Sequence, residues 1–351
     1  MDSILTLDNI WLGLALKLGL IIVFFLVAPL VIGYIEHKGL AHMQSRLGPM
    51  EAAFHGIGQL PADGIKFIQK EDIIPANADK WVFSLAPGVA LVPVLVVLAV
   101  IPFGPGLFAE NIDTGIFFAL AVSSVGVIGI LMAAWSSANK FSLMGGIRAA
   151  AQLIAYELPL VLAAAAVVLQ AGTMSLVGIV EAQNTFLLFG TIPVPYAFPQ
   201  AVGLVLFFVA ALAELSRPPF DMPIADSEII FGHMTEYTGL RYAFFMLAEY
   251  AGIVVLSALA TVMFLGGWYP WPGVPLPSFS VGPVPGELVA ALAGFAVTFG
   301  KITMLAFVMI WFRATFPRLR EDQLQRVSWL IFIPLAILNI VVVAIFKVVA
   351  S

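Results

Sequence analysis

Long apolar runs dominate this chain. A run of about twenty apolar residues is long enough to cross roughly 30 Å of hydrocarbon as a helix. Eight such runs lie near residues 12–34, 82–103, 115–138, 149–170, 199–216, 242–266, 288–312 and 329–349. Apolar and polar positions do not alternate within them, which argues against the strands of a membrane barrel. The pattern predicts an all-α polytopic membrane protein with eight transmembrane helices, forming a single membrane domain over residues 1–351.

The composition agrees with this pattern and excludes several kinds of cofactor site. The 351 residues are 61% hydrophobic and 11% charged, whereas about a quarter of a soluble domain is charged. The chain has no cysteine, so it cannot ligate an iron–sulfur cluster through thiolates. We find no nucleotide-binding or metal-binding motif, so we expect no flavin or metal held by this chain. The net charge of −5 argues against a nucleic-acid partner.

The distribution of basic residues predicts the orientation in the membrane. Thirteen Lys and Arg residues fall in the segments 36–81, 139–148, 217–241 and 313–328. The alternate segments contain only acids, namely Asp2, Asp8, Glu110, Asp113, Glu181 and Glu287. Because Lys and Arg in short loops stay on the cytoplasmic side, the four basic segments should face inward and both termini outward. The acids before the first run also predict no cleaved signal peptide.

The inner segments are longer than simple connectors. In EAAFHGIGQLPADGIKFIQK, residues 51–70, apolar residues recur at roughly helical spacing around Pro61. This favours an amphipathic helix lying at the membrane interface within the first inner loop, 36–81. The second long loop, 217–241, is acidic, and the third, 313–328, is basic.

Three of the apolar runs carry an acid, Glu157, Glu214 or Glu249, and the seventh run carries Lys301. Each costs roughly 2.5–3.5 kcal/mol near the bilayer centre. The total of about 10–14 kcal/mol rivals the net stability of a whole domain, about 5–15 kcal/mol, which favours a functional role. A structural alternative is that Glu214 reaches water at its helix end, and that Glu249 and Lys301 form an ion pair.

Carboxylates also cluster just after the fifth run, in ELSRPPFDMPIADSE, residues 214–228. Burial disfavours a charged carboxylate, so such acids can take up and release protons near neutral pH. We expect a coupled set of acids that includes Glu157, Glu214, Asp221, Asp226, Glu228, Glu236 and Glu249. Glu214 and Arg217 would be neighbours if the helix continued to residue 217. The prolines at 218, 219 and 223 predict a stiff, non-helical loop.

Five segments, in order along the chain, resemble the H-type membrane subunit of respiratory complex I, the counterpart of subunit 1 in mitochondria. They are IEHKGLAHMQSRLGP, ADGIKFIQKEDIIP, GGIRAAAQLIAYELP, AELSRPPFDMPIADSEIIFGHMTEY and WFRATFPRLREDQL. The resemblance covers nearly the whole chain and implies a subunit that encloses a quinone chamber and couples quinone reduction to proton translocation. The implied quinone-binding residues are Glu36, Arg46, Asp63, Arg217, Phe220, Asp221 and Arg313. The implied proton relay comprises Glu157, Glu214, Asp226, Glu228, Glu236, Glu249 and Lys301.

The sequence departs from the family pattern at a few positions. Ile224 stands where relatives often have a glutamate, and Met234 stands where they often have a histidine. His37 replaces an arginine, and Glu321 replaces a common tyrosine. The first of these changes removes a carboxylate that relatives often have in the loop at residues 224–234.

The resemblance also implies partners and a location. Quinone would be the substrate, and electrons would come from the terminal iron–sulfur cluster of peripheral-arm subunits. Small and antiporter-like membrane-arm subunits and the lipid bilayer complete the expected partners. We expect the plasma membrane of a prokaryote rather than the mitochondrial inner membrane. Two alternatives stay open: the homologous anchor of an energy-converting hydrogenase or formate hydrogenlyase, and a stand-alone secondary transporter.

Overall fold

Helices account for nearly all of the chain in the computed structural model, which describes residues 10–188, 192–224, 226–277 and 285–350. In this part of the chain seven helices are long and apolar enough to cross a membrane. They are α1 (Ile10–Met43), α3 (Lys80–Leu98), α4 (Gly115–Ser136), α5 (Lys140–Ala171), α9 (Gly239–Phe264), α10 (Gly286–Thr315) and a continuous helix over 321–349. The last consists of α11 (Glu321–Val327), a π-helical turn η3 (Ser328–Phe332) and α12 (Ile333–Ala350). The prediction of a helical membrane protein is confirmed.

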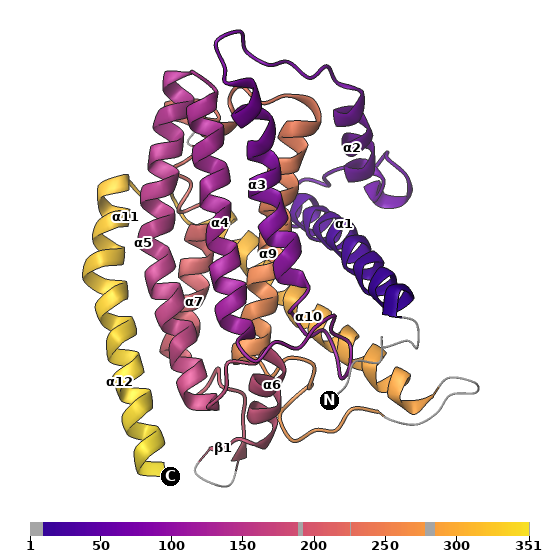
Figure 1. Ribbon diagram of the computed structural model, residues 1–351, viewed down its shortest axis with the longest axis vertical. Helices are drawn as coiled ribbons and strands as arrows, with labels where there is room; N and C mark the ends of the chain where they lie inside the picture. The colour runs from indigo at the N-terminus through magenta and orange to yellow at the C-terminus, as the bar shows by residue number, and fades with distance from the viewer. Residues whose placement is uncertain (1–9, 189–191, 225, 278–284, 351) are drawn as a thin grey trace.

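The fifth apolar run folds as α7 (Ala201–Glu214), which has only 14 residues. At 1.5 Å per residue it is about 21 Å long, shorter than the hydrocarbon layer. It nevertheless lies within the bundle beside α5 (Figure 1). The eighth crossing therefore stays a prediction, because it requires the turns at both ends of α7 to complete the span.

Local sequence signals explain where several helices begin and end. The Asn139 side chain accepts a hydrogen bond from Phe141 N at 2.9 Å and caps α5. Gly172 ends the same helix in the left-handed conformation, at φ 76°, which is most accessible to glycine. Asp79 caps α3 by accepting from Trp81 N at 3.2 Å.

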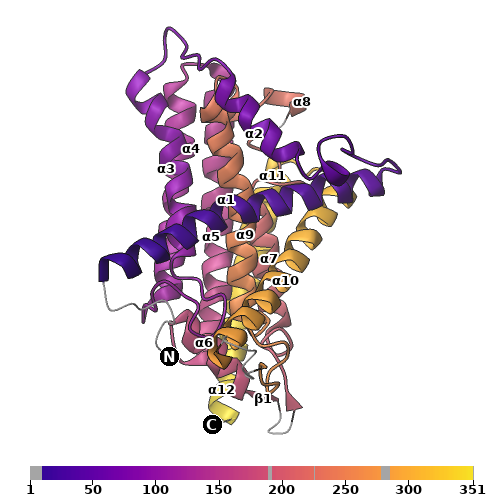
Figure 2. The same ribbon diagram turned by 90° about the vertical axis from the view of Figure 1, so that its right-hand side faces the viewer.

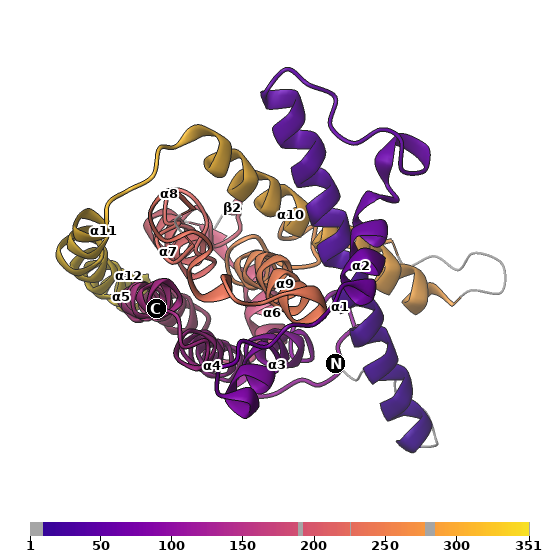
Figure 3. The ribbon, with the colours of Figure 1, turned by 90° about the horizontal axis from the view of Figure 1, so that it is seen from above.

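Helix α9 is the centre of the bundle. Viewed from above, it is surrounded by α3, α5, α7 and α10 (Figure 3), and its residues from Ala251 to Phe264 are all buried. Helices α1 and α10 cross the bundle obliquely, whereas α12 stands at its edge against α5 (Figures 1 and 2). Small residues allow close approach: a Cβ added to Gly129 of α4 would lie 2.5 Å from Ala90 N of α3.

The connecting segments gather at two opposite ends of the bundle. At one end lie η1 (Phe54–Gly56), α2 (Gln59–Gln69), α8 (Asp226–Ile229) and η2 (Gly232–Met234). The other end carries α6 (Leu176–Thr185) and an antiparallel pair, β1 (Leu187–Leu188) with β2 (Ile192–Pro193) (Figure 1). Helix α2 lies in the segment 36–81, where a helix is expected, although it begins at Gln59 rather than near residue 51; its place on the inner side of the membrane stays a prediction. Ile65 and Ile68 on it are exposed, as an interfacial helix requires.

Candidate functional site

A buried ion-pair chain connects three helices and a loop. Glu36 lies on α1, and both it and Arg217 are almost wholly buried, at 2% and 1% exposure. Arg217 Nη1 donates to Glu36 Oε2 at 2.7 Å, and Arg313 at the end of α10 pairs with the other Glu36 oxygen. The Glu36 carboxylate thus bridges two guanidinium groups. Because Arg313 is 39% exposed, this series of ion pairs begins at the molecular surface.

Arg217 continues the chain toward the interior. Its Nε donates to Glu249 Oε1 of α9 at 3.0 Å, and its guanidinium carbon lies 4.9 Å from the centre of the Tyr250 ring. The position of Arg217 follows from the end of α7 at Glu214, after which Ser216 turns the backbone at φ 51°. Arg217 therefore points at Glu36 and Glu249, and the expected Glu214–Arg217 neighbour pair is not among the ion pairs of the described residues.

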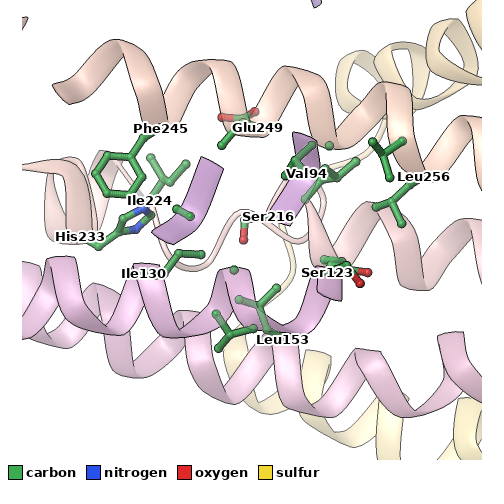
Figure 4. Close-up of a pocket in the computed structure, with 18 of the residues that line it drawn as sticks. Val94, Ser123, Ile130, Leu153, Ser216, Ile224, His233, Phe245, Glu249 and Leu256 are labelled. Carbon is green, nitrogen blue, oxygen red and sulfur yellow. The ribbon is translucent and has the colours of Figure 1, made fainter. Parts of the chain in front are cut away.

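Glu249 also lines a central cavity of about 150 Å³ between α3, α4, α5 and α9 (Figure 4). Glu214, Ser216 and Ser123 line it too, together with His233 and a mainly apolar wall. Such a volume has room for several water molecules, since one needs roughly 10–15 Å³ on this measure. Two acids from different helices therefore share one space that can hold water.

Glu157 extends this pair along α5. Its charge interacts with that of Glu214. Gln152, one turn earlier on α5, donates to Ala213 O at 2.6 Å and to Phe220 O at 2.8 Å. These bonds hold the end of α7 and the following loop against α5. The structure thus brings three of the predicted relay acids, Glu157, Glu214 and Glu249, into one region.

Other predicted relay residues lie at the end of the bundle that carries α2 and α8. Glu228 is 47% exposed and pairs with Arg148 at 2.6 Å and with Arg318 at 3.5 Å. The hydrogen bond from Arg148 lowers the pKa of Glu228. Glu236 accepts from Asn139 Nδ2 at 2.5 Å and lines a polar cleft of about 360 Å³ with Asn77 and Lys140. Neither acid lines the central cavity. Asp226 begins α8, but its side chain lies outside the described residues.

The predicted quinone-binding residues are only partly brought together. Glu36, Arg217 and Arg313 form the ion-pair chain described above. Arg46 is exposed, and its Nε donates to Gln44 Oε1 at 2.8 Å. Asp63 lies on α2 and pairs with Lys66 at 2.8 Å, a hydrogen bond that lowers the pKa of Asp63.

Phe220 and Asp221 lie on the loop that follows α7. The Phe220 ring is 4% exposed, and its centre lies 5.2 Å from that of Tyr156. This contact makes Phe220 part of the packed core rather than of an open surface. Asp221, the next residue, is partly buried.

Lys301 does not have the partner that the sequence suggested, which was Glu249. Its Nζ donates to the backbone oxygens of Leu265, Gly267 and Tyr269, at 2.5, 3.1 and 2.6 Å. It therefore caps the C-terminal end of α9, where carbonyl groups have no partner within the helix. The alternative in which Lys301 pairs with Glu249 is wrong, because Glu249 pairs with Arg217 and lies 15 residues before the end of α9 that Lys301 caps.

Sequence reasoning missed two residues of this region. Tyr250 packs its ring against Arg217, and its only signal was its place directly after Glu249. His233 lines the central cavity, and its signal was a polar residue among apolar ones in EIIFGHM. Across the residues that the structure describes, no group of three or more His, Cys, Asp and Glu side chains could hold a metal ion.

Comparisons with known proteins give a consistent result. A family model described as NADH dehydrogenase matches residues 16–344. The chain is 42% identical over 344 residues to the H-type subunit of NADH-quinone oxidoreductase from Geobacillus thermodenitrificans, covering 96% of each chain. It is 41% identical over 353 residues to the H-type subunit from Bacillus mycoides, covering 99% of this chain and 98% of that one. It is 40% identical over 355 residues to the first of the numbered H-type subunits from Geobacter sulfurreducens, covering 95% of both.

Proposed function

The chain belongs to the NADH dehydrogenase family, among the H-type membrane subunits of NADH-quinone oxidoreductase, and on that premise we propose that it forms the wall of a quinone chamber and couples quinone reduction to proton translocation. The resemblance in the sequence and the similarity to H-type subunits point to the same complex. Full-length matches to these subunits favour this function over the anchor of a hydrogenase.

One observation carries the proposal. An unbroken series of ion pairs runs from Arg313 through Glu36 and Arg217 to Glu249, and Glu249 lines the cavity that also contains Glu214. Three predicted quinone-binding residues, Glu36, Arg217 and Arg313, are therefore linked by ion pairs to one predicted relay acid, Glu249. A change of charge at the Arg313 end alters the field at Glu249, because charges interact strongly where water is excluded.

These ion pairs offer a route by which the free energy of quinone reduction can raise the proton affinity of the acids. Reduction of one quinone to quinol takes up two electrons and two protons. The chain has no cysteine to hold a cluster, so the electrons come from a peripheral-arm partner that carries the terminal iron–sulfur cluster. Negative charge on the bound quinone, before it is protonated, attracts protons to nearby carboxylates. We assign the uptake and transfer of those protons to Glu214, Glu249 and Glu157.

The membrane topology is part of the same proposal. Eight crossings with both termini outside would place α2, α8 and the Glu228 ion pairs on the cytoplasmic side, where the peripheral arm docks. Exposed apolar side chains on α1, such as Leu14 and Val23, suit contact with lipid or with other membrane-arm subunits. The bacterial relatives support the plasma membrane of a prokaryote as the location.

The test is replacement of Glu214 by Gln, and separately of Glu157 by Gln, in the assembled complex. Quinone reductase rate and proton pumping are then measured in sealed vesicles. We expect both to fall, because glutamine cannot bind and release a proton. Glu181→Gln, at an exposed position of α6 at the opposite end of the bundle, is the control. Normal rates and normal pumping in both cavity variants would contradict the proposal.

The alternative function, that of a stand-alone secondary transporter, predicts a different result. It requires that the purified single chain, reconstituted alone, move a solute with protons. The proposed function requires that the isolated chain have no oxidoreductase activity and that activity return only with the partner subunits.

A further inference from the structure

His233 occupies a defined position at one end of the central cavity. It belongs to η2, is 6% exposed, and lines the cavity together with Glu249 (Figure 4). Glu214 lines the same cavity. The backbone holds His233 there: Ser142 Oγ of α5 donates to His233 O at 3.3 Å. Its ring lies edge-on to Phe245, with centres 5.5 Å apart. The imidazole is thus held between α5 and α9.

One ring nitrogen of His233 is unsatisfied within the described residues. Nδ1 is buried and has no hydrogen-bond partner there, although buried polar atoms are almost always bonded to protein or to water. The cavity that it lines is large enough for water. Burial lowers the pKa of His233 to about 4, so the ring is neutral at physiological pH. A neutral imidazole has one donor and one acceptor nitrogen.

The surroundings of His233 show what it could connect. Ile224 lies beside it and carries no titratable group (Figure 4), and Glu214 and Glu249 are the charged side chains of the cavity lining. Three residues further along, Glu236 lines the polar cleft at the inner end, where it bonds to Asn139. The segment 233–236 therefore contributes a titratable side chain to each of the two spaces.

We propose that His233 transfers protons between the inner polar cleft at Glu236 and the central cavity that holds Glu214 and Glu249. The inference rests on the proposed function, since it supplies the step by which the cavity acids regain protons. In each transfer one ring nitrogen gains a proton from water on the cleft side, and the other gives one to water in the cavity. One proton is moved, the ring changes tautomer, and rotation of the ring or exchange with water restores it.

The test is His233→Gln in the complete complex, with His42→Gln as the matched control. Glutamine keeps hydrogen-bonding capacity but cannot relay a proton, and His42 is exposed on α1, away from the cavity. We expect the protons pumped per NADH to fall by about half or more in the first variant, and to be unchanged in the control. If His233→Gln does not assemble, His233→Phe keeps a ring against Phe245 and has the same expected result.

A rescue experiment separates proton transfer from packing. Ile224→Glu in the His233→Gln background places a carboxylate beside the lost imidazole, and we expect part of the pumping to return. Loss of pumping without this recovery would indicate a structural role and overturn the inference. Normal pumping in the His233 variants, with impaired Glu214→Gln, would overturn the inference and leave the proposed function standing. Normal pumping in all of them would overturn both.

Discussion

Arg217 and Glu36 form an ion pair of 2.7 Å between side chains that are 1% and 2% exposed, although 181 positions separate them in the chain. Taking two charges out of water is expensive, and the cost is recovered only when both are well paired. Glu36 bonds to two arginines and Arg217 to two glutamates. The Glu36 carboxylate and the Arg217 guanidinium therefore each offset the free-energy cost of burying the other.

Removal of Arg217 should be among the most damaging single changes. Arg217→Met leaves Glu36 and Glu249 close together without their shared cation, and breaking a buried pair costs roughly 3–5 kcal/mol. We expect a lower thermal unfolding midpoint of the complex and loss of quinone reductase activity. The double variant Arg217→Met, Glu36→Leu should be less destabilised than the sum of the single variants. If the losses of stability in the two single variants simply added up in the double variant, the two residues would not be coupled.

Lys301 gives a prediction about stability. Lys301→Met removes the donor for three backbone oxygens at the end of α9, and a charged hydrogen bond contributes roughly 1.5–3 kcal/mol. We expect a lower thermal midpoint, measured on the purified complex. Lys17→Met is the comparison, because Lys17 has one such bond, to Ala109 O at 2.7 Å. An equal effect of both variants would argue against the capping role.

Gly145 should tolerate no larger residue. A Cβ added there would lie 2.6 Å from Gly232 Cα and 2.9 Å from His233 N, so Gly145→Ala must push η2 away from α5. We expect reduced assembly, and reduced proton pumping in the complex that does form. Gly88→Ala in α3 is the matched control, since its added Cβ would have no atom within 4 Å. There alanine should stabilise the helix by about 0.5–1 kcal/mol.

His233 also predicts a dependence of stability on pH. Burial lowers its pKa from 6.5 to about 4, so the folded protein binds this proton more weakly than the unfolded chain does. The corresponding stability is present above pH 6.5 and is lost as the pH falls toward 4. Between about pH 7.5 and about pH 4.5 the loss should be roughly 2–3 kcal/mol.

The measurement for this prediction is the thermal midpoint of the complex at the two pH values. His233→Gln should lose less stability on acidification than the parent protein. Other acids, such as Asp63 and Glu228, titrate in both proteins and cancel in the comparison. An identical pH dependence of the two proteins would contradict the environment described for His233.

The sequence alone determined the class of the protein and most of its helices. Apolar runs of membrane length are a property of neighbouring residues, and the long helices lie where these runs predict them, with ends that differ by up to nine residues. The loop rich in proline after Glu214 is predicted to be non-helical, and α7 does end at Glu214. The family resemblance follows from motifs that are contiguous in the chain, and the comparisons confirm the family.

Only the tertiary structure decided which charges meet. Glu36 and Arg313 are 277 positions apart, and no periodicity along one helix can predict that pair. The same limit explains why the sequence allowed Lys301 as a partner of Glu249, whereas the end of a neighbouring helix satisfies it. Pairing inside a membrane protein depends on the crossing angles of several helices, which small residues such as Gly129 and Gly145 set by allowing close approach. Sequence reveals which residues are costly to bury, and the packing decides what makes their burial tolerable.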